Sequence, residues 1–264
     1  MAIDKPAADA DANIDQSIVI RTIGPGDLRD VLAKGFDDFN AMPTFALFLV
    51  VLYPIIGLIL FRIVFEQDLL PLAFPLIAGF TLIGPFAAIG LYQLSRLREQ
   101  GLAISWEALK LHRSPSLGAI LTLGIVLLAI FLTWLATAQA IYHLIFGSAV
   151  PVSIAEFARQ VLTTPAGWTL IFVGCGVGFV FAAVVLAISV VSFPMLLDQN
   201  VGVATAVRTS VRAVFANPMT MAMWGLVVTG ALAIGSLPFL AGLAIVLPLL
   251  GHSTWHLYRK VVEC

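Results

Sequence analysis

Charged residues are scarce in this sequence: Asp, Glu, Lys and Arg together make up 11% of its 264 residues. A soluble domain carries about 25%, so the composition excludes an ordinary water-soluble protein. Charge is absent from residues 39–61, 69–95, 114–155, 160–197 and 213–258. A membrane-spanning helix needs about 20 apolar residues, and continuous rather than alternating apolarity favours helices over a β-barrel. The sequence therefore predicts an all-α, polytopic membrane protein.

The apolar stretches divide into six expected transmembrane helices. The third stretch holds one helix and then a loop, because Gly147, Ser148 and Pro151 follow its apolar part. The fifth stretch is long enough for two helices, and Pro238 marks the break because proline lacks a backbone donor and disrupts a helix. We therefore expect crossings near residues 42–65, 69–95, 116–146, 166–196, 218–235 and 238–258.

Lysine and arginine are distributed unevenly between the two sides of this arrangement. Of 14 such residues, only Arg62 and Arg159 fall on one side. Because basic loops stay in the cytoplasm, both termini are expected there. Residues 1–24 are acidic and lack the apolar region of a signal peptide. We expect them to form a disordered or extended cytoplasmic segment before a single transmembrane domain, residues 25–264.

Further absences narrow the range of functions. The two cysteines, Cys175 and Cys264, cannot form a disulfide framework. No basic patch is dense enough for nucleic acid, and the sequence has no nucleotide-binding loop, nucleophile elbow or redox cysteine pair. No charged residue lies in the central third of an expected helix, where ion pathways usually carry one. The sequence therefore disfavours an enzyme or an ion-coupled pump.

Three charged, half-apolar segments ending in proline precede expected crossings: residues 27–43, 102–115 and 203–218. Apolar residues recur at helical spacing in the first (Leu28, Val31, Leu32, Phe36, Phe39) and in the third (Val207, Val211, Val214). Asp37 and Asp38 are expected on the water-exposed face. This pattern is typical of amphipathic helices in the membrane interface, here on the cytoplasmic side. The sequence can thus be divided into three tandem hairpin units, 25–101, 102–201 and 202–264, or into three similar but unrelated hairpins.

His252 and His256 are the strongest candidates for a binding site. They stand four residues apart, so both project from one helix face, and such a pair can hold a metal ion. His112 is expected on the same side of the membrane and could be a third ligand. The alternative is that both rings belong to an interfacial belt and hydrogen-bond neighbouring helices. No cofactor is expected, with metal or haem binding at this pair as the alternative.

Two other features have competing interpretations. Gly174 and Gly178 form a small-xxx-small pair that lets helices approach closely, either within the chain or between two copies of it. Asp198 is a candidate gate or proton carrier, but Asp and Asn readily cap helices. We therefore favour Asp198 or Asn200 as a cap of the following helix.

Three strings resemble an uncharacterised bacterial family of predicted integral membrane proteins: GPFAAIGLYQLSRLREQG (84–101), SFPMLLDQNVGVATAVRTSVRAVFANP (192–218) and LPLLGHSTWHLYRKVV (247–262). The likeness extends from about residue 20 to the end of the chain. It implies a protein of the bacterial inner membrane with no assigned activity and no catalytic residue to transfer.

The function that these features favour is non-enzymatic: a scaffold, accessory or assembly factor for other inner-membrane components. Its expected partners are the lipid bilayer and other membrane proteins, and a homo-oligomer is compatible with the glycine pair. A small-solute transporter is the alternative, because Pro54, Pro71, Pro75, Pro85 and Pro248 could break helices around a site. Metal or haem binding through His252 and His256 is the third option.

Overall fold

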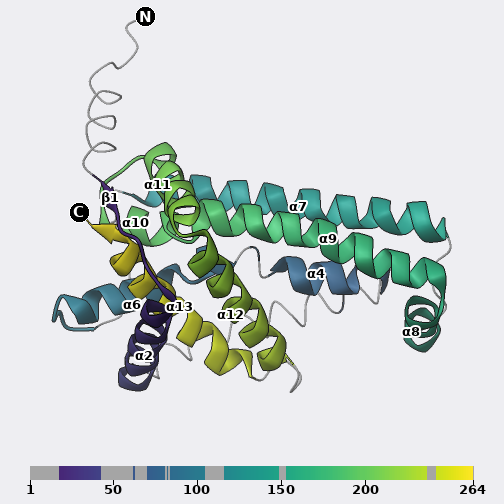
Figure 1. Cartoon of the computed structure of the whole chain (residues 1–264), viewed down its shortest axis with the longest axis horizontal. Coiled ribbons are helices and arrows are strands. Elements are labelled where there is room, and N and C mark those ends of the chain that lie inside the picture. The colour runs from purple at the N-terminus through teal and green to yellow at the C-terminus, as the bar shows by residue number, and fades with distance from the viewer. Residues whose placement is uncertain are drawn as a thin grey trace, which may run out of the picture. The chain divides into compact units, whose positions relative to one another are not determined.

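The computed structural model describes residues 18–42, 62, 70–80, 82, 84–104, 116–148, 153–236 and 242–263 of the chain. The chain divides into two compact units. Unit 1 comprises residues 1–52, 85–124 and 186–264, and unit 2 comprises residues 53–84 and 125–185. Figure 1 shows the elements of both.

Unit 1 is built around α13 (Leu243–Val261), which packs against α2, α6, α10 and α12. The bounds of these and the remaining elements of the unit are β1 (Val19–Ile20), α2 (Pro25–Ala41), α6 (Ile89–Glu99), α10 (Ser192–Asp198), α11 (Val203–Ala216), α12 (Pro218–Ser236) and β2 (Val262–Glu263). Proline at the first position starts α2, and the Asp27 carboxylate accepts from the Gly24 backbone N–H at 2.9 Å. A side chain at Gly35 would collide with Ser253, so α2 and α13 are in backbone-close contact.

The two ends of unit 1 are joined by a short antiparallel ladder. Val19 pairs with Glu263 and Ile20 with Val262. The Arg21 guanidinium then binds the Glu263 carboxylate at 2.5 Å. Asn217, before α12, donates to the Arg21 carbonyl at 3.0 Å and accepts from the Ile23 backbone N–H at 2.7 Å. The segments near the two termini therefore lie beside each other.

Unit 2 is organised around Trp134, whose indole is 4% exposed. Its elements are η1 (Leu70–Leu72), α4 (Ala73–Phe80), most of α7 (Leu117–Phe146), α8 (Ile154–Thr163) and most of α9 (Pro165–Ser189). Trp134 Nε1 donates to the Pro75 carbonyl of α4 at 2.9 Å, and its ring lies 5.6 Å from that of Phe181 on α9. Gly79 on α4 and Gly178 on α9 leave room for the indole. Trp134 thus connects three helices.

The expectation of an all-α membrane protein is confirmed in its coarse form. Within the described residues, three helices are long and apolar enough to cross a membrane: α7, the continuous stretch Pro165–Asp198 formed by α9 and α10, and α12. They correspond to three of the six expected crossings, and the structure does not confirm six. The expected helix at 42–65 lies outside the described residues apart from residues 42 and 62.

Two other expected crossings differ from a simple spanning helix. The stretch 69–95 is broken into η1, α4, α5 (Gly84–Ala87) and α6, and Pro71, Pro75 and Pro85 all fall in it. In place of a helix at 238–258 the structure has α13, whose second half is polar, with histidines, serine and threonine before Arg259 and Lys260. The division into tandem units 25–101, 102–201 and 202–264 stays a prediction.

The expected interfacial segments are only partly described. Helices α2 and α11 form close to where the sequence predicts them, whereas residues 105–115 of the second segment lie outside the described part of the chain. One expectation about exposure is wrong. Asp38 is 4% exposed and not on a water-exposed face. The buried face of α11 consists of Thr205, Ala206, Thr209, Ser210 and Ala213, while its valines are only half-buried.

Candidate functional site

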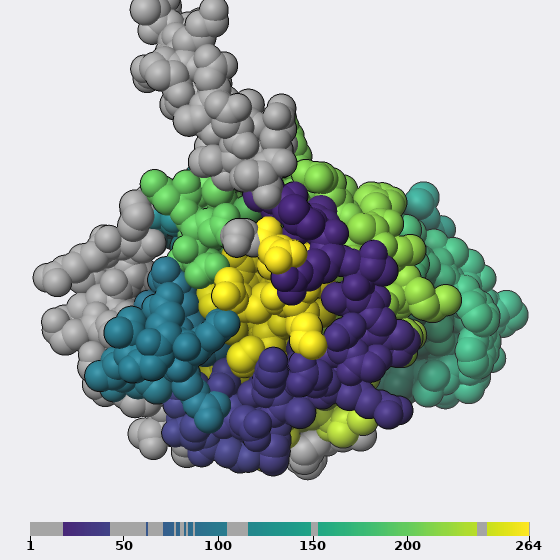
Figure 2. Space-filling model, turned by 60° about the vertical axis from the view of Figure 1, so that its left-hand side comes forward, coloured from purple at the N-terminus to yellow at the C-terminus, as the bar shows by residue number. Residues whose placement is uncertain are grey.

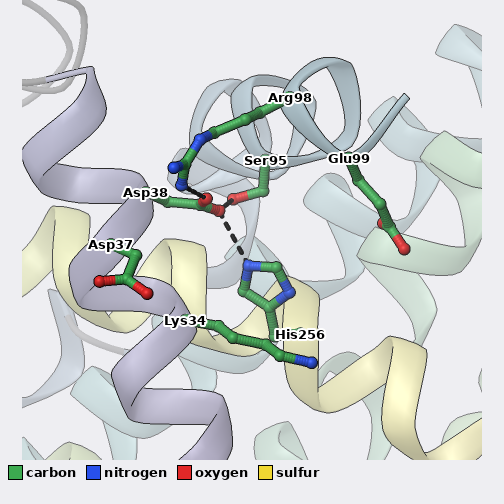
Figure 3. Close-up of a pocket in the computed structure, with 7 residues that line it drawn as sticks. All are labelled: Lys34, Asp37, Asp38, Ser95, Arg98, Glu99 and His256. Carbon is green, nitrogen blue, oxygen red and sulfur yellow. Dashed lines mark hydrogen bonds and ion pairs between the residues drawn. The ribbon is translucent and has the colours of Figure 1, made fainter. Parts of the chain in front are cut away.

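Asp38 is the centre of a polar cluster formed by α2, α6 and α13. Its Oδ1 accepts from Arg98 Nη1 at 2.5 Å, and its Oδ2 accepts from Ser95 Oγ at 2.5 Å and His256 Nε2 at 2.9 Å. Figure 3 shows these three side chains converging on the carboxylate from two helices. His252 Nδ1 lies 2.8 Å from Ser95 Oγ and 4.0 Å from Asp38 Oδ2. One carboxylate therefore holds together residues up to 218 positions apart in the sequence.

These contacts determine the ionisation of Asp38. Burial alone raises the pKa of a carboxyl, but the hydrogen bonds from His256, Ser95 and Arg98 outweigh it and hold the pKa of Asp38 below its ordinary value. Asp38 is therefore a carboxylate at neutral pH, and an acceptor only. His256 must donate its Nε2 proton to it.

His252 carries its ring proton on Nδ1. The single hydroxyl proton of Ser95 goes to Asp38, so the contact with His252 requires His252 to donate from Nδ1. The side chain of His252 is fully buried. Burial lowers the pKa of His252 to about 4; His256 and Arg98 add to this shift, whereas the Asp38 carboxylate and the Leu91 backbone oppose it. At neutral pH His252 is therefore a neutral ring.

A second polar cluster joins α6, α10 and α13. Asp198 accepts from the Tyr258 hydroxyl at 2.9 Å, from Arg96 Nε at 3.3 Å and from Arg259 Nη1 at 3.4 Å. Glu99 accepts from Trp255 Nε1 at 2.9 Å and from Arg259 Nε at 3.1 Å. Arg259 thus bridges the two carboxylates, and the end of α13 is fixed to both neighbouring helices.

A pocket of about 350 Å³ opens beside the Asp38 cluster. It is lined by Lys34, Asp37, Asp38, Ser95, Arg98, Glu99 and His256. Figure 2 shows the face on which α13 (yellow) emerges between α2 (purple) and α6 (blue). The three lining carboxylates exceed the two permanent cations by one negative charge, but Asp38, Arg98 and Glu99 already bind protein partners. The pocket therefore offers little surplus charge for a strongly charged ligand.

The predicted histidine pair is brought into one cluster, but each ring has a protein partner. His252 binds Ser95 and His256 binds Asp38. His112 lies outside the described residues. Among those that are described, no group of three His, Cys, Asp or Glu side chains has a metal-binding arrangement. Metal or haem binding at His252 and His256 stays a prediction.

The other predicted residues lie elsewhere. Asp198 does not cap α11, whose N-cap is Gly202 without a side-chain cap. Gly178 faces the Trp134 ring, and a β-carbon added at this glycine would lie 3.1 Å from the indole. One added at Gly174 would have nothing within 4 Å among the described residues. The pair thus packs within the chain at one of its two positions.

Sequence reasoning missed Asp38, Ser95 and Arg98. Ser95 and Arg98 are three apart on α6, so they project from one face, but many surface helices have such a pair. Nothing in the local sequence indicates that this face meets Asp38, 57 positions away.

The arrangement resembles a hydrolytic Ser–His pair only in composition. In a nucleophilic serine the base accepts the hydroxyl proton, whereas Ser95 donates it to Asp38. Arg98, His256 and Ser95 each donate a hydrogen bond to the Asp38 carboxylate. The cluster therefore holds α2, α6 and α13 together, and Ser95 is not activated as a nucleophile.

Comparison with known proteins confirms the family resemblance for residues 73–198, which contain the first of the three strings; its wider extent stays a prediction. Residues 73–198 match the model of a family described as "Predicted integral membrane protein (DUF2189)". The matched part begins with α4 and ends with α10, so it includes Ser95, Arg98 and Asp198 and leaves out Asp38, His252 and His256. No curated protein and no solved structure matches the chain.

Proposed function

We propose that this chain is a non-enzymatic protein of the bacterial inner membrane that acts as a scaffold or assembly factor for other membrane components. The observation that carries the proposal is the division of its surfaces. Polar groups of unit 1 bind one another, whereas large apolar side chains of α9 face outward: Phe172 is 71% and Phe179 73% exposed. An outward apolar face contacts lipid or the helices of a partner.

The spans themselves contain little that could move an ion. Within the three described spans, the one charged residue is Asp198, which is the last residue of α10. Ion and proton pathways usually carry charged groups inside the membrane, because such groups are costly and persist where they are used. This favours a binding or organising role over coupled transport.

The ladder between β1 and β2 supports the proposed topology, with both termini in the cytoplasm. Strands that pair must lie on the same side of a membrane. The chain between residues 20 and 262 then crosses an even number of times, so it crosses at least once more than the three described spans. Reporter fusions at each terminus test this. Opposite compartments for the two ends would contradict it.

The scaffold role is tested by photo-cross-linking in living cells. A photoreactive residue in place of Phe172 should form adducts with a defined set of membrane proteins, and deletion of the chain should lower their abundance in the membrane. The matched control is Phe181, which packs on Trp134 and should cross-link within the chain. Adducts with lipid alone at Phe172, together with an unchanged membrane proteome on deletion, would refute the proposal.

One observation favours a second candidate, a small-solute transporter. The stretch 70–99 is broken into short helices, and broken helices expose backbone carbonyls that can bind a solute. However, one backbone carbonyl of this stretch, that of Pro75, already accepts a hydrogen bond from Trp134 Nε1. Flux through proteoliposomes that falls on substitution of Pro85 by alanine would support transport, and an unchanged flux would count against it.

A further inference from the structure

Helix α8 is amphipathic along its whole length. Apart from Ala155, its apolar residues occupy positions 154, 157, 158, 161 and 162, the spacing of one helix face. On the other face Glu156 binds Arg159 at 2.7 Å and Gln160 at 2.9 Å. No residue of α8 is fully buried, and Ile154 and Leu162 are 56% and 59% exposed. The apolar face is thus largely uncovered by the part of the protein that the structure describes.

Chain connectivity places α8 at a membrane boundary. It begins eight residues after the end of α7 and ends two residues before α9, and both neighbours are long and apolar enough to cross a membrane. A helix between two consecutive crossings lies where one ends and the next begins. Trp168, 49% exposed in the first turn of α9, is a residue type enriched at that depth.

The turn from α8 into α9 is tightly fixed. Thr164 is extended, its hydroxyl donates to the Gln160 carbonyl at 2.7 Å, and it accepts from the Gly167 backbone N–H at 3.0 Å. A side chain at Gly167 would collide with the carbonyls of Gln160 and Val161. Figure 1 shows α8 turning away from the axis of α9. On the apolar face, the centre of the Phe157 ring lies 6.2 Å from that of Tyr142 on α7.

We propose that α8 is an interfacial anchor: it lies in the plane of the bilayer surface, with its apolar face among the lipid acyl chains and Glu156, Arg159 and Gln160 toward water. The occupant of the exposed apolar face is lipid, because the ends of both adjoining spans bring it to the acyl boundary. The proposal rests on the membrane placement of α7 and α9. By the proposed topology this surface is the one opposite the termini.

Spin labels in lipid nanodiscs test the proposal directly. In a chain with Cys175→Ser and Cys264→Ser, labels are placed at Leu162→Cys on the apolar face and at its neighbour Thr163→Cys on the polar face. Oxygen, which concentrates among acyl chains, should reach the first label better than a water-soluble nickel complex does. At Thr163→Cys the order should reverse.

The outcomes separate the alternatives. Nickel access at both positions would show a helix in water, and access of neither reagent at Leu162→Cys would show a protein cover; either result overturns the anchor. A third label at Phe179→Cys in the middle of α9 tests the membrane placement itself. Oxygen access there with failure at α8 refutes only the anchor, whereas nickel access there refutes the membrane placement as well.

Discussion

Acid should weaken this fold through His252 before it affects the carboxylates. The pKa of His252 falls from 6.5 to about 4 on folding because the ring is buried. Between these values the unfolded chain binds a proton that the folded chain excludes, so stability falls as the pH drops from 6.5 towards 4. A shift of this size corresponds to a loss of about 3 kcal/mol at pH 4, complete below the folded pKa.

The surroundings of His252 explain why the loss should be confined to this range. The charged and titratable groups facing it are Asp38 from α2, Arg98 from α6 and His256 from α13. Asp38 has a lowered pKa, so its contribution is present above its unfolded value near 4 and disappears only as the pH falls through the lower folded value. The Asp38 contribution is therefore lost at a lower pH than that of His252.

The assay is chemical unfolding in nanodiscs from pH 7 to pH 4, followed by tryptophan fluorescence. His252→Gln removes the titrating ring and should flatten the pH dependence between 6.5 and 4, whatever its stability at pH 7. The matched control is His143→Gln, since His143 is exposed at the end of α7 and bonds to Gln139 and the Gly147 carbonyl. An equal loss of stability in His252→Gln and the unsubstituted chain would refute the reasoning.

Other substitutions test the contacts that hold each unit together. Asp38→Asn removes the charge that Arg98 and His256 bind and should cost about 3–5 kcal/mol of unfolding free energy, whereas Asp37→Asn next to it should change stability by less than about 0.5 kcal/mol; equal effects would contradict the assigned cluster. Gly35→Ala should lower the unfolding midpoint by overpacking, at about 1–3 kcal/mol, while Gly26→Ala, with nothing within 4 Å among the described residues, should not; a neutral Gly35→Ala would disprove the close helix contact. Trp134→Phe removes the indole N–H that donates to the Pro75 carbonyl and should lower the free energy of unfolding by about 1–3 kcal/mol; an unchanged thermal midpoint would rule out this hydrogen bond.

The spanning helices can be predicted because their signal is local. An apolar run of sufficient length must be helical in lipid, and the expected helix at 116–146 is found at Leu117–Phe146. The expected helix at 218–235 is found at Pro218–Ser236. The amphipathic spacing of α8 is also present in the sequence, but the turn residues before it favour a loop.

The stretch 69–95 is divided into short helices, and the prolines in its sequence explain why. Pro71, Pro75 and Pro85 each remove a backbone donor, yet hydropathy is insensitive to such a break. Apolarity alone therefore predicts one continuous helix where the structure has several short ones.

The Asp38 cluster could not be predicted, because it depends on how closely three helices approach. Gly35 lets α2 contact α13 at Ser253, and Gly251 lets α13 contact Leu91 of α6. These two close approaches bring the Asp38 carboxylate within reach of Ser95 and His256. A charge on an amphipathic helix is ordinarily expected in water. Asp38 is buried because Gly35 on its own helix and Gly251 on α13 allow the close packing that brings its hydrogen-bond partners to it. The determinants of the cluster are thus two glycines as much as the polar residues that form it.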